Sequence, residues 1–450
     1  MVGNSRRLCA GARIAVIGGG PAGSFFAHFA QNWANRLGFP VAITIFDGKD
    51  FLKCGPKGCN LCAGVIAGSL EDRLRAEGLF LPEQRIISRV EGYTLHLGQE
   101  TLKLTCRENA QLPIATVFRG NGPRYSSFPE VVSFDDYLLS WARDRGVEVI
   151  PQPVWEIRMP PSPGQPLALM YGENRSPQLF EADFIVGAFG VNTHLTRMTR
   201  GLGFGYVPPR TLTTFQAEIK LGREEAAGLF GRDIHVYLPR SPTIRYATII
   251  PKGEYITVTV VGKKDATPGL ANEFFGLEEI RRLLPPAEAN CHCYPRIVIS
   301  ASRRPFSDRL VLIGDAAFCR HYKNGIESAF HTARLAAEAV FTRGVGADAM
   351  FSAYYKRAKA LIARDNMYGR VLFFLNDIIS SLPLLARTHI ELANRPRAGP
   401  AARKIRSIVW NMFTGGIPYR EIFLAALDLR LQVSLIKNAI SLIFHRKKQP

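Results

Sequence analysis

Three cysteines stand close together near the start of the chain, in the segment KCGPKGCNLCAG of residues 53–64. Cys54, Cys59 and Cys62 have the C-x4-C-x2-C spacing of a plant-type iron–sulfur ligand run, which needs a fourth cysteine from elsewhere in the chain. The same thiols could instead form a redox-active or structural disulfide, or stay reduced and face an active site. The cysteines available as a fourth ligand are Cys106, Cys291, Cys293 and Cys319.

The composition favours reduced thiols. The chain has 450 residues and eight cysteines, and its hydrophobic share of 47% is that of a globular protein. Its first residues lack the apolar core and cleavage region of an export signal, so disulfides are disfavoured. Cys291 and Cys293 flank His292 in a segment that resembles a short metal-binding motif. No second pair follows at zinc spacing, and a strand with two small inward residues is therefore favoured.

A strand, a glycine turn, a helix and a second strand are expected between residues 13 and 47. The run RIAVI is typical of a buried parallel strand, and GGGPAG follows it at once. Aromatic residues at helical spacing come next, and VAITIFD then predicts a strand that ends at Asp47. An acid at this place can accept hydrogen bonds from a ribose diol. Strand, glycines, helix, strand and acid in this order predict dinucleotide binding, for which glycines alone would be weak evidence.

Each glycine of this motif has a physical role. Gly18 allows the tight turn, Gly20 lets the backbone approach a pyrophosphate, and Gly23 lets the helix pack closely against the strand. Pro21 and Ala22 complete the cofactor-binding turn. The N–H groups and the dipole of the helix N-terminus then attract phosphate.

A second segment, RLVLIGDAA at residues 309–317, also predicts a strand and a turn. Residues 310–313 form the strand, Gly314 and Asp315 end it, and an amphipathic helix is expected over residues 325–340. An acid between a strand and a helix N-terminus suits a ribityl or pyrophosphate group. The alternative is a plain strand–turn–helix in which Asp315 is only a turn former.

The pair of motifs, GGGPAG and the later GDAA, resembles the flavoprotein hydroxylase and geranylgeranyl reductase superfamily. The resemblance implies that both motifs bind FAD. It also implies that Asn324, Gly325 and Ile326, which match an N/E-G-I step of the superfamily, lie beside the flavin ring. The turn before this step, FCRHYK, departs from the usual small and apolar residues. The residues expected to reshape the flavin's surroundings are His321, Tyr322 and Lys323.

Two further segments are similar to the reductase branch. In YATIIP, Tyr246 and Pro251 match residues that line the substrate cavity in that branch, while Thr248 and Ile250 replace a tryptophan and a phenylalanine. The alternative is an ordinary strand with Tyr246, Thr248 and Ile250 on one face. The second segment is Cys62-Ala63-Gly64, which matches a flavin-facing loop.

The position of Cys62-Ala63-Gly64 in the chain bears on whether the three cysteines bind a cluster, form a disulfide or stay reduced. A loop against the flavin accounts for the glycines by close approach of the backbone to the ring, and it favours free thiols over a cluster or a disulfide. The resemblance makes Cys62 the candidate catalytic residue, as a proton donor, as a wall of the cavity or as a group that stacks against the reduced ring. Its reactivity depends on its thiolate fraction.

One departure concerns the electron donor. The hydroxylases have an acid in the segment that reads DFIVGAFG here, and Phe189 replaces it. NADPH docking of the hydroxylase kind is therefore disfavoured, and the donor is expected to be NAD(P)H in another arrangement or a reduced carrier protein.

The C-terminal region is basic and helical. The net charge of the chain is +19, and residues 385–450 contain 12 Lys and Arg against 3 Asp and Glu. This asymmetry indicates an anionic partner. Residues 431–444 are apolar but too short to span a bilayer, so they predict either a helix in the headgroup region of an anionic membrane or a helical cap. Nucleic acid is disfavoured, because the basic residues interleave with apolar helices.

Together these observations predict an α/β protein with a Rossmann-like, discontinuous FAD-binding domain, a sheet-rich substrate domain and a C-terminal helical region. The FAD-binding domain is expected from residues 1–75, 128–195 and 296–345, the substrate domain from residues 76–127 and 196–295, and the helical region from residues 346–450.

The expected function is that of a geranylgeranyl-reductase-like, FAD-dependent oxidoreductase. It would reduce carbon–carbon double bonds of an apolar isoprenoid or lipid substrate by hydride transfer from reduced flavin. The alternatives are a flavin-dependent monooxygenase or halogenase, and a flavin- or lipid-binding protein without turnover. The expected location is cytoplasmic, peripheral on the inner face of the membrane.

Overall fold

The structure is a computed structural model. It describes residues 7–109, 111–160, 162, 164–173, 176–284, 289–322, 324–395 and 399–446.

A six-stranded sheet forms the first half of the fold, in the order β20-β21-β12-β1-β2-β8. β1 lies between β12 and β2 and pairs with both in parallel. Its residues Ile14 to Ile17 are buried on both faces of the sheet, which explains the continuous apolar run in the sequence. The strands are β1 (Ala12–Ile17), β2 (Val41–Phe46), β8 (Glu148–Ile150), β12 (Phe184–Gly187), β20 (Phe306–Ser307) and β21 (Leu310–Leu312).

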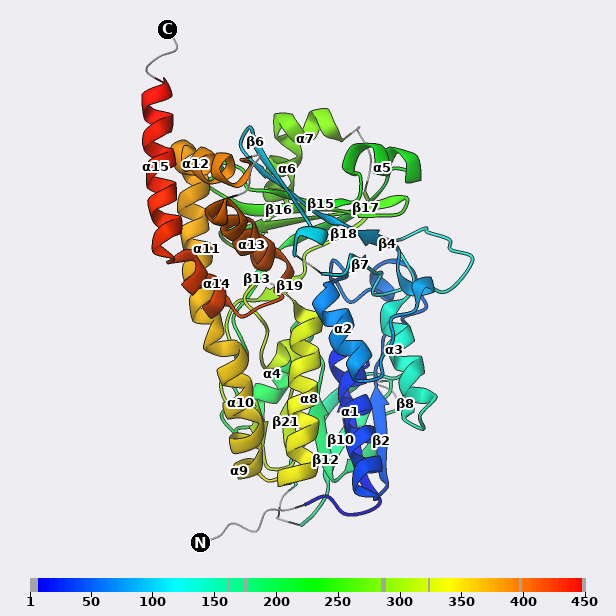
Figure 1. Ribbon diagram of the computed structural model, residues 1–450. Coiled ribbons are helices and arrows are strands. Elements are labelled where there is room, and N and C mark those ends of the chain that lie inside the picture. Colours follow the sequence, from blue (N-terminus) through cyan, green and yellow to red (C-terminus); the bar gives the residue numbers. More distant parts are fainter. Residues whose placement is uncertain are drawn as a thin grey trace.

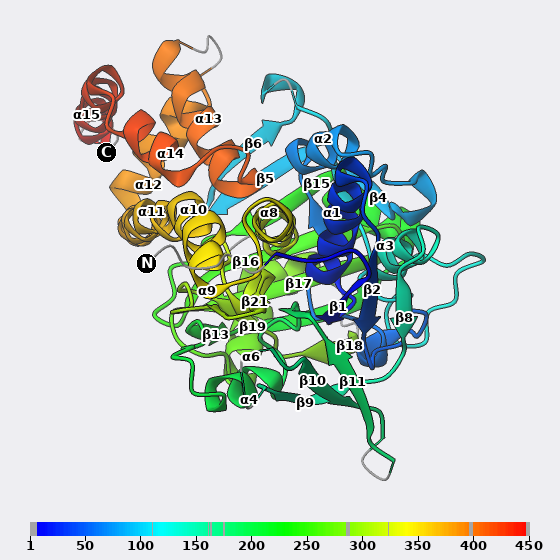
Figure 2. The ribbon, with the colours of Figure 1, turned by 90° about the horizontal axis from the view of Figure 1, so that it is seen from below.

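Two long helices cover one face of this sheet. They are α1 (Pro21–Leu37) and α8 (Gly325–Arg343), which follow the two glycine motifs and lie side by side (Figure 1). Phe330 of α8 packs edge-on against Phe25 and Phe29 of α1, with ring centroids 5.7 and 5.3 Å apart. The other face carries a meander of β9 (Val154–Arg158), β10 (Leu167–Tyr171) and β11 (Gln178–Ala182) (Figure 2). The predicted α/β fold class is confirmed.

A seven-stranded sheet, in the order β18-β14-β17-β16-β15-β5-β6, forms the second half. One face packs against the helices α5 (Arg223–Phe230), α6 (Pro268–Gly276) and α7 (Glu278–Leu283). The other face turns toward the C-terminal helices. The strands are β5 (Gly92–Leu97), β6 (Glu100–Thr105), β14 (Phe215–Lys220), β15 (Asp233–Tyr237), β16 (Ile244–Lys252), β17 (Tyr255–Gly262) and β18 (Ala289–Cys293).

Smaller elements connect the two sheets. α3 (Phe134–Arg143) packs on α1, and the Ser133 hydroxyl caps its N-terminus by accepting the Asp136 N–H at 3.1 Å. The remaining strands and helices are β3 (Val65–Ile66), β4 (Ser88–Val90), β7 (Ile114–Thr116), β13 (Thr211–Thr213), β19 (Arg296–Val298), α2 (Gly68–Ala76) and α4 (Leu195–Gly201).

After α8 the described chain is helical to its end. A long helical run contains α9 (Ala347–Ala349), the π-helical η5 (Met350–Tyr355), α10 (Lys356–Ala358), the π-helical η6 (Lys359–Ala363) and α11 (Asp365–Ser381). It is followed by α12 (Pro383–Ala393), α13 (Pro400–Thr414), α14 (Tyr419–Ala426) and α15 (Leu429–Arg446).

These helices pack on the seven-stranded sheet. Trp410 of α13 is fully buried, stacks edge-on against Tyr93 of β5 at 5.6 Å, and donates its indole N–H to the Gln111 side-chain oxygen at 3.1 Å. None of the described helices is long and apolar enough to cross a membrane alone. The run 347–381 and α12, bent by 104° at their junction, meet the length and composition for a span only as a pair.

Candidate active site

A cavity of about 1270 Å³ runs through the middle of the molecule. One end lies at the glycine turn after β1, and the other lies among the C-terminal helices. Apolar side chains from the seven-stranded sheet and from α11, α13 and α15 line most of the second part. The two motifs that the sequence predicts for FAD binding therefore open into one long, largely apolar chamber.

The first motif forms the floor at one end of this cavity. Gly18 has a φ of +106°, and a Cβ there would lie 2.7 Å from the carbonyl oxygen of Ala188. Gly20 caps α1, and Pro21 and Ala22 form its first turn against the cavity. The helix thus directs its N–H groups into a space where backbone can approach a ligand, which is the arrangement that binds a pyrophosphate.

Gly23 lies behind this turn, outside the cavity lining. A Cβ at Gly23 would collide with the carbonyl oxygen of Gly18 and would touch Val16 of β1 at 3.1 Å. The absence of a side chain therefore lets α1 pack directly on the strand, as the sequence pattern predicts.

Asp47 ends β2 at the rim of the same space. Its carboxylate accepts the Gly19 N–H at 2.7 Å and the Lys49 N–H at 2.8 Å, so backbone groups hold it in place. Burial raises the pKa of Asp47, against the lowering effect of these two hydrogen bonds. The carboxylate lines the cavity and retains lone pairs for a ribose diol.

The second motif meets the first from the other side. Asp315 lies in η4 (Gly314–Ala316), and its Oδ1 is buried and has no hydrogen-bond partner among the described residues. Burial raises the pKa of Asp315. An unpaired buried carboxylate oxygen is costly unless a ligand supplies the donor. This orphaned acceptor beside the glycine cradle fits the hydroxyl groups of a flavin side chain.

Gly314 supports this acid from behind the cavity. It has a φ of +60°, and its N–H is donated to the Thr332 hydroxyl of α8 at 2.9 Å. A Cβ at Gly314 would lie 2.9 Å from the Cβ of Ala22, so the two glycine motifs touch each other at this point.

The step Asn324-Gly325-Ile326 lines the cavity at the N-terminus of α8. Asn324 has a φ of +54°, and its amide donates to the carbonyl of Thr414 at 3.0 Å. This step is therefore attached to the end of α13 as well as to α8.

The unusual turn before this step anchors the C-terminal helices. Arg320 donates to the carbonyls of Gly415 at 2.7 Å and Ile417 at 2.6 Å. The Tyr419 hydroxyl donates to the carbonyl of His321 at 2.8 Å. Of the three residues expected to reshape the flavin's surroundings, Tyr322 lines the cavity, His321 is buried among these contacts, and Lys323 lies outside the described residues.

Of the three motif cysteines, only Cys62 lines the large cavity. Cys54 donates its thiol to the carbonyl of Asn121 at 3.1 Å. Cys59 faces a separate small hollow that Cys293 also lines, and burial raises the pKa of both thiols, for Cys293 to about 12. These two groups are therefore protonated at neutral pH.

All eight cysteines belong to the described residues, and none of them forms a disulfide. No set of three or more His, Cys, Asp or Glu side chains is arranged to hold a metal in the part of the chain that the structure describes.

Three residues that the sequence did not single out complete the cradle. The guanidinium of Arg119 pairs with Asp135 at 2.5 and 2.9 Å, and Asn60 donates to the same carboxylate. Arg119 and Asn60 lie directly over Gly20, within 3.9 and 3.2 Å of where its Cβ would be. Burial tends to lower the pKa of Arg119, but the charge of Asp135 outweighs this and raises it far above the usual value. A protonated guanidinium thus stands over the phosphate-binding turn as one half of an ion pair, because the Asp135 carboxylate lies equally close to Gly20, at 3.8 Å from the place of its Cβ.

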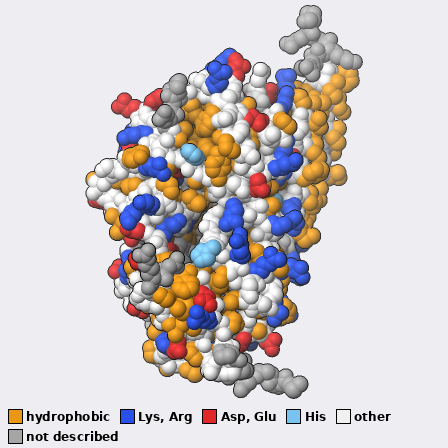
Figure 3. Space-filling model, turned by 180° about the vertical axis from the view of Figure 1, so that it is seen from behind, with side chains coloured by type: hydrophobic (Ala, Val, Ile, Leu, Met, Phe, Trp, Pro, Cys, Tyr) orange, Lys and Arg blue, Asp and Glu red, His pale blue; other side chains and the backbone are white. Residues whose placement is uncertain are grey.

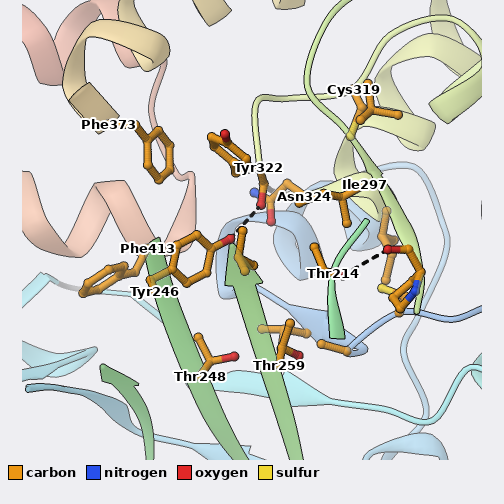
Figure 4. A pocket seen from close by; sticks show the side chains of 18 of the residues that line it. Thr214, Tyr246, Thr248, Thr259, Ile297, Cys319, Tyr322, Asn324, Phe373 and Phe413 are labelled. Carbon is orange, nitrogen blue, oxygen red and sulfur yellow. Dashed lines mark hydrogen bonds between the residues drawn. The ribbon is translucent and has the colours of Figure 1, made fainter. Parts of the chain in front are cut away.

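The substrate side of the cavity is built on β16. Tyr246, Thr248 and Ile250 all face the cavity, because alternate residues of a strand point to the same side (Figure 4). The Tyr246 hydroxyl donates to the carbonyl of Tyr322 at 3.5 Å. Pro251 points to the opposite side of the strand and lies outside the cavity lining, so the structure does not bring it together with Tyr246.

Aromatic rings close the far wall of this part. Phe373 of α11 and Phe413 of α13 stand across from Tyr246 (Figure 4). Thr248 and Thr259, which pair across β16 and β17, form a small polar spot on the floor. The chamber therefore suits an apolar ligand with few polar groups.

Phe189 follows β12 and also lines the cavity. Its backbone lies against Gly18, with 3.2 Å between its Cα and the place of a Cβ on that glycine. An aromatic ring therefore occupies the position at which the hydroxylases have an acid.

Comparison with solved structures identifies the architecture. A flavoprotein/dehydrogenase from Cytophaga hutchinsonii matches with a TM-score of 0.67 at 16% identity, covering 96% of this chain and 99% of that one. The flavin-dependent brominase Bmp2 matches with a TM-score of 0.65 at 17% identity, covering 98% and 100%. A geranylgeranyl bacteriochlorophyll reductase-like protein from Thermoplasma acidophilum matches with a TM-score of 0.64 at 14% identity, covering 93% and 98%.

The chain has the flavoprotein hydroxylase fold. No model of a known protein family matches it, and no curated protein matches it by sequence. At this level of identity the likeness shows the fold and leaves the reaction to be argued from the site.

Proposed function

We propose that this protein is an FAD-dependent oxidoreductase that reduces carbon–carbon double bonds of an apolar isoprenoid or lipid substrate. The observation that carries the proposal is the single cavity, which joins a dinucleotide cradle to a long apolar chamber. The orphaned Oδ1 of Asp315 and the glycine turn at Gly18 and Gly20 fit the cofactor. FAD would supply, when bound and reduced, the hydride that is transferred to one carbon of the double bond.

The chain would supply position, a dry environment and a proton. Arg119 and the N-terminus of α1 would hold the diphosphate, and Asp47 would hold the ribose. Tyr246 and the aromatic wall would orient the substrate and exclude water from the chamber. The second carbon of the double bond needs a proton, and the Cys62 thiol is the candidate donor because it faces the cavity beside the predicted position of the flavin.

The electron donor belongs to the same proposal. Phe189 removes the acid that NADPH docking of the hydroxylase kind would use. We expect NAD(P)H in another arrangement or a reduced carrier protein to reduce the flavin. Stopped-flow reduction of the purified protein with each donor would separate the two.

Mass spectrometry of host lipids tests the reaction class. Cells that overproduce the protein should contain isoprenoid chains heavier by pairs of hydrogens than those of control cells. The purified protein should carry bound FAD, seen as flavin absorbance in the holoprotein. A flavin-free protein, or unchanged lipids in cells with holoprotein, would overturn the proposal.

A monooxygenase or halogenase is the second candidate, because the brominase Bmp2 shares the whole fold at a similar TM-score. In that case the products in the same experiment would be heavier by oxygen or halogen. The chamber and the cofactor cradle would keep their roles, and Cys62 would be a wall of the cavity.

Cys62 gives a sharper prediction within the reductase proposal. Cys62→Ala should lower kcat by roughly 10²–10⁴-fold, which is the usual contribution of a positioned acid, with little change in KM. Cys62→Ser nearly keeps the size of the side chain but replaces the thiol by a hydroxyl, which is a much weaker acid, so it should be nearly as slow. Single-turnover oxidation of the reduced protein by substrate would measure the step.

The exposed Cys9 offers a matched control, and Cys9→Ser should behave as wild type. Retained FAD in all variants shows that the site is intact. If Cys62→Ser turned over at the wild-type rate, the thiol would be only a wall of the cavity.

A further inference from the structure

The last helix, α15, exposes a continuous apolar stripe. Leu429, Val433, Ile436, Ile440 and Ile443 are spaced at three and four residues, and each exposes 42% to 77% of its side chain. At about 100° per residue they share one face of the helix. The opposite face packs on α12 and α13. A stripe of this kind on the surface of a folded protein marks an interaction site rather than chance exposure.

A second stripe on α11 continues this surface. Met367, Val371, Phe374 and Ile378 follow the same helical spacing, and Phe374 exposes 62% of its side chain. Leu424 and Leu427, of α14 and the turn that follows it, are also exposed. Figure 3 shows an apolar strip along this edge of the molecule, with basic side chains along its border. We call these three stretches together the apolar edge.

The cavity reaches the apolar edge. Leu427 and Ile436 of this edge, and Leu375 beside the stripe of α11, are exposed and also line the cavity that begins at the glycine turns. Gln432 and Ala439 of α15 belong to the same part of the lining. An apolar ligand could therefore pass from the surface to the flavin site along apolar side chains.

The charges around the edge are predominantly basic. Arg364 and Arg370 flank the stripe of α11 on opposite sides, by helical spacing. Acids of the same helices are largely engaged: Asp377 pairs with Arg245 at 3.1 Å, and Asp428 pairs with Lys404 at 2.6 Å. Along α11, α14 and α15, the exposed basic residues with no ion pair to a described side chain are Arg364, at the start of α11, and Arg370, Arg420, Arg430 and Lys437.

We propose that the apolar edge docks the protein on an anionic lipid leaflet and that the substrate enters the cavity from that leaflet. Apolar side chains flanked by Lys and Arg are what an interfacial helix needs to lie among anionic headgroups. The cavity opens within this surface, which accounts for the position of the apolar edge on the molecule. The entry path rests on the proposed function, while the docking stands on the surface alone.

Flotation with vesicles tests the docking. Vesicles of phosphatidylcholine and phosphatidylglycerol at roughly 7:3 should carry the purified holoprotein, and vesicles of phosphatidylcholine alone should carry much less. The double variant Val433→Asp/Ile440→Asp should lose about tenfold or more in partitioning, because both side chains are exposed and lie outside the cavity lining. Arg430→Glu/Lys437→Glu should lose the preference for anionic vesicles.

Leu37→Asp/Leu179→Asp is the matched control, since both leucines are exposed but lie far from the C-terminal helices in the sequence and on other elements. It should bind vesicles as wild type does. Flavin absorbance and turnover of a detergent-dispersed substrate should be unchanged in the Val433/Ile440 variant, while turnover of substrate embedded in vesicles should fall.

The outcomes separate the two proposals. Vesicle binding by a protein that contains no FAD would contradict the proposed function and would leave the docking proposal standing. Equal binding by the Val433/Ile440 variant and wild type would overturn the docking. The docking would also be overturned if the wild-type protein were a dimer that does not bind vesicles and the Val433/Ile440 variant were a monomer. That result would assign the apolar edge to contact with a second copy of the chain.

Discussion

Replacing Gly23 by alanine should yield a protein that no longer retains FAD and is less stable without it. The new Cβ would collide with the carbonyl oxygen of Gly18, which is backbone and has no room to rotate away. Relief of the clash would push α1 from β1 and move the N–H groups that face the phosphate site. Overpacking of this kind costs about 1–3 kcal/mol or more in the free energy of unfolding. Urea unfolding of the flavin-free protein and flavin absorbance after gel filtration would measure both effects.

Gly228 provides the control for this prediction. It lies in the helix α5, and a Cβ there would meet nothing within 4 Å. Gly228→Ala should therefore be neutral or stabilise the protein by roughly 0.5–1 kcal/mol, as alanine does in an open helical position. Full retention of FAD by Gly23→Ala would show that α1 need not approach the strand so closely, and would weaken the assignment of the glycine turn.

The glycine motifs could be predicted from the sequence because the interactions that shape them involve residues that are close together in the chain. The turn at Gly18, the approach at Gly20 and the acid at Asp47 are set by residues that follow one another along two strands and a helix. The strand–turn–helix around Asp315 is local in the same way. What the sequence left open there was whether the acid only forms the turn, and the buried, unpartnered Oδ1 now supports a ligand.

Long-range pairings were not predictable in this way. Arg119 lies 16 residues before Asp135, and neither belongs to a recognisable motif; only the packing of the loop over α1 places them above Gly20. In the segment FCRHYK, the expectation concerned the surroundings of the flavin, and Tyr322 of this segment does line the cavity. The arginine of the same segment also holds the link between α13 and α14, about a hundred residues later, which no pattern in the turn itself indicates.

The strand at Tyr246 shows how a local rule limits what a resemblance implies. The family likeness assigned both Tyr246 and Pro251 to the substrate cavity, yet their positions in one strand differ by five, an odd number. Strand alternation places such a pair on opposite faces unless a bulge intervenes. The irregular pairing of β16 lies between Ile244 and Tyr246, before this segment, so the alternation holds through Pro251.

The second large effect is expected for Arg119→Met. Arg119 is only 8% exposed and Asp135 is fully buried, so the variant would leave an unpaired carboxylate in the interior. Breaking a buried ion pair from one side costs about 3–5 kcal/mol in the free energy of unfolding. The same change would remove the positive charge above the phosphate-binding turn. We therefore expect a marked loss of stability together with weaker FAD binding, by urea unfolding and by fluorescence titration of FAD.

A second variant separates the two consequences. Arg119→Met/Asp135→Asn removes the stranded charge and should regain much of the stability, yet it should still bind FAD more weakly than wild type, by roughly tenfold or more for one lost charge-assisted hydrogen bond. Arg158→Met, which breaks an exposed pair with Glu156, should leave the free energy of unfolding nearly unchanged. If the double variant bound FAD as tightly as wild type, Arg119 would only fix the loop over α1, and the N-terminus of that helix would hold the diphosphate without it.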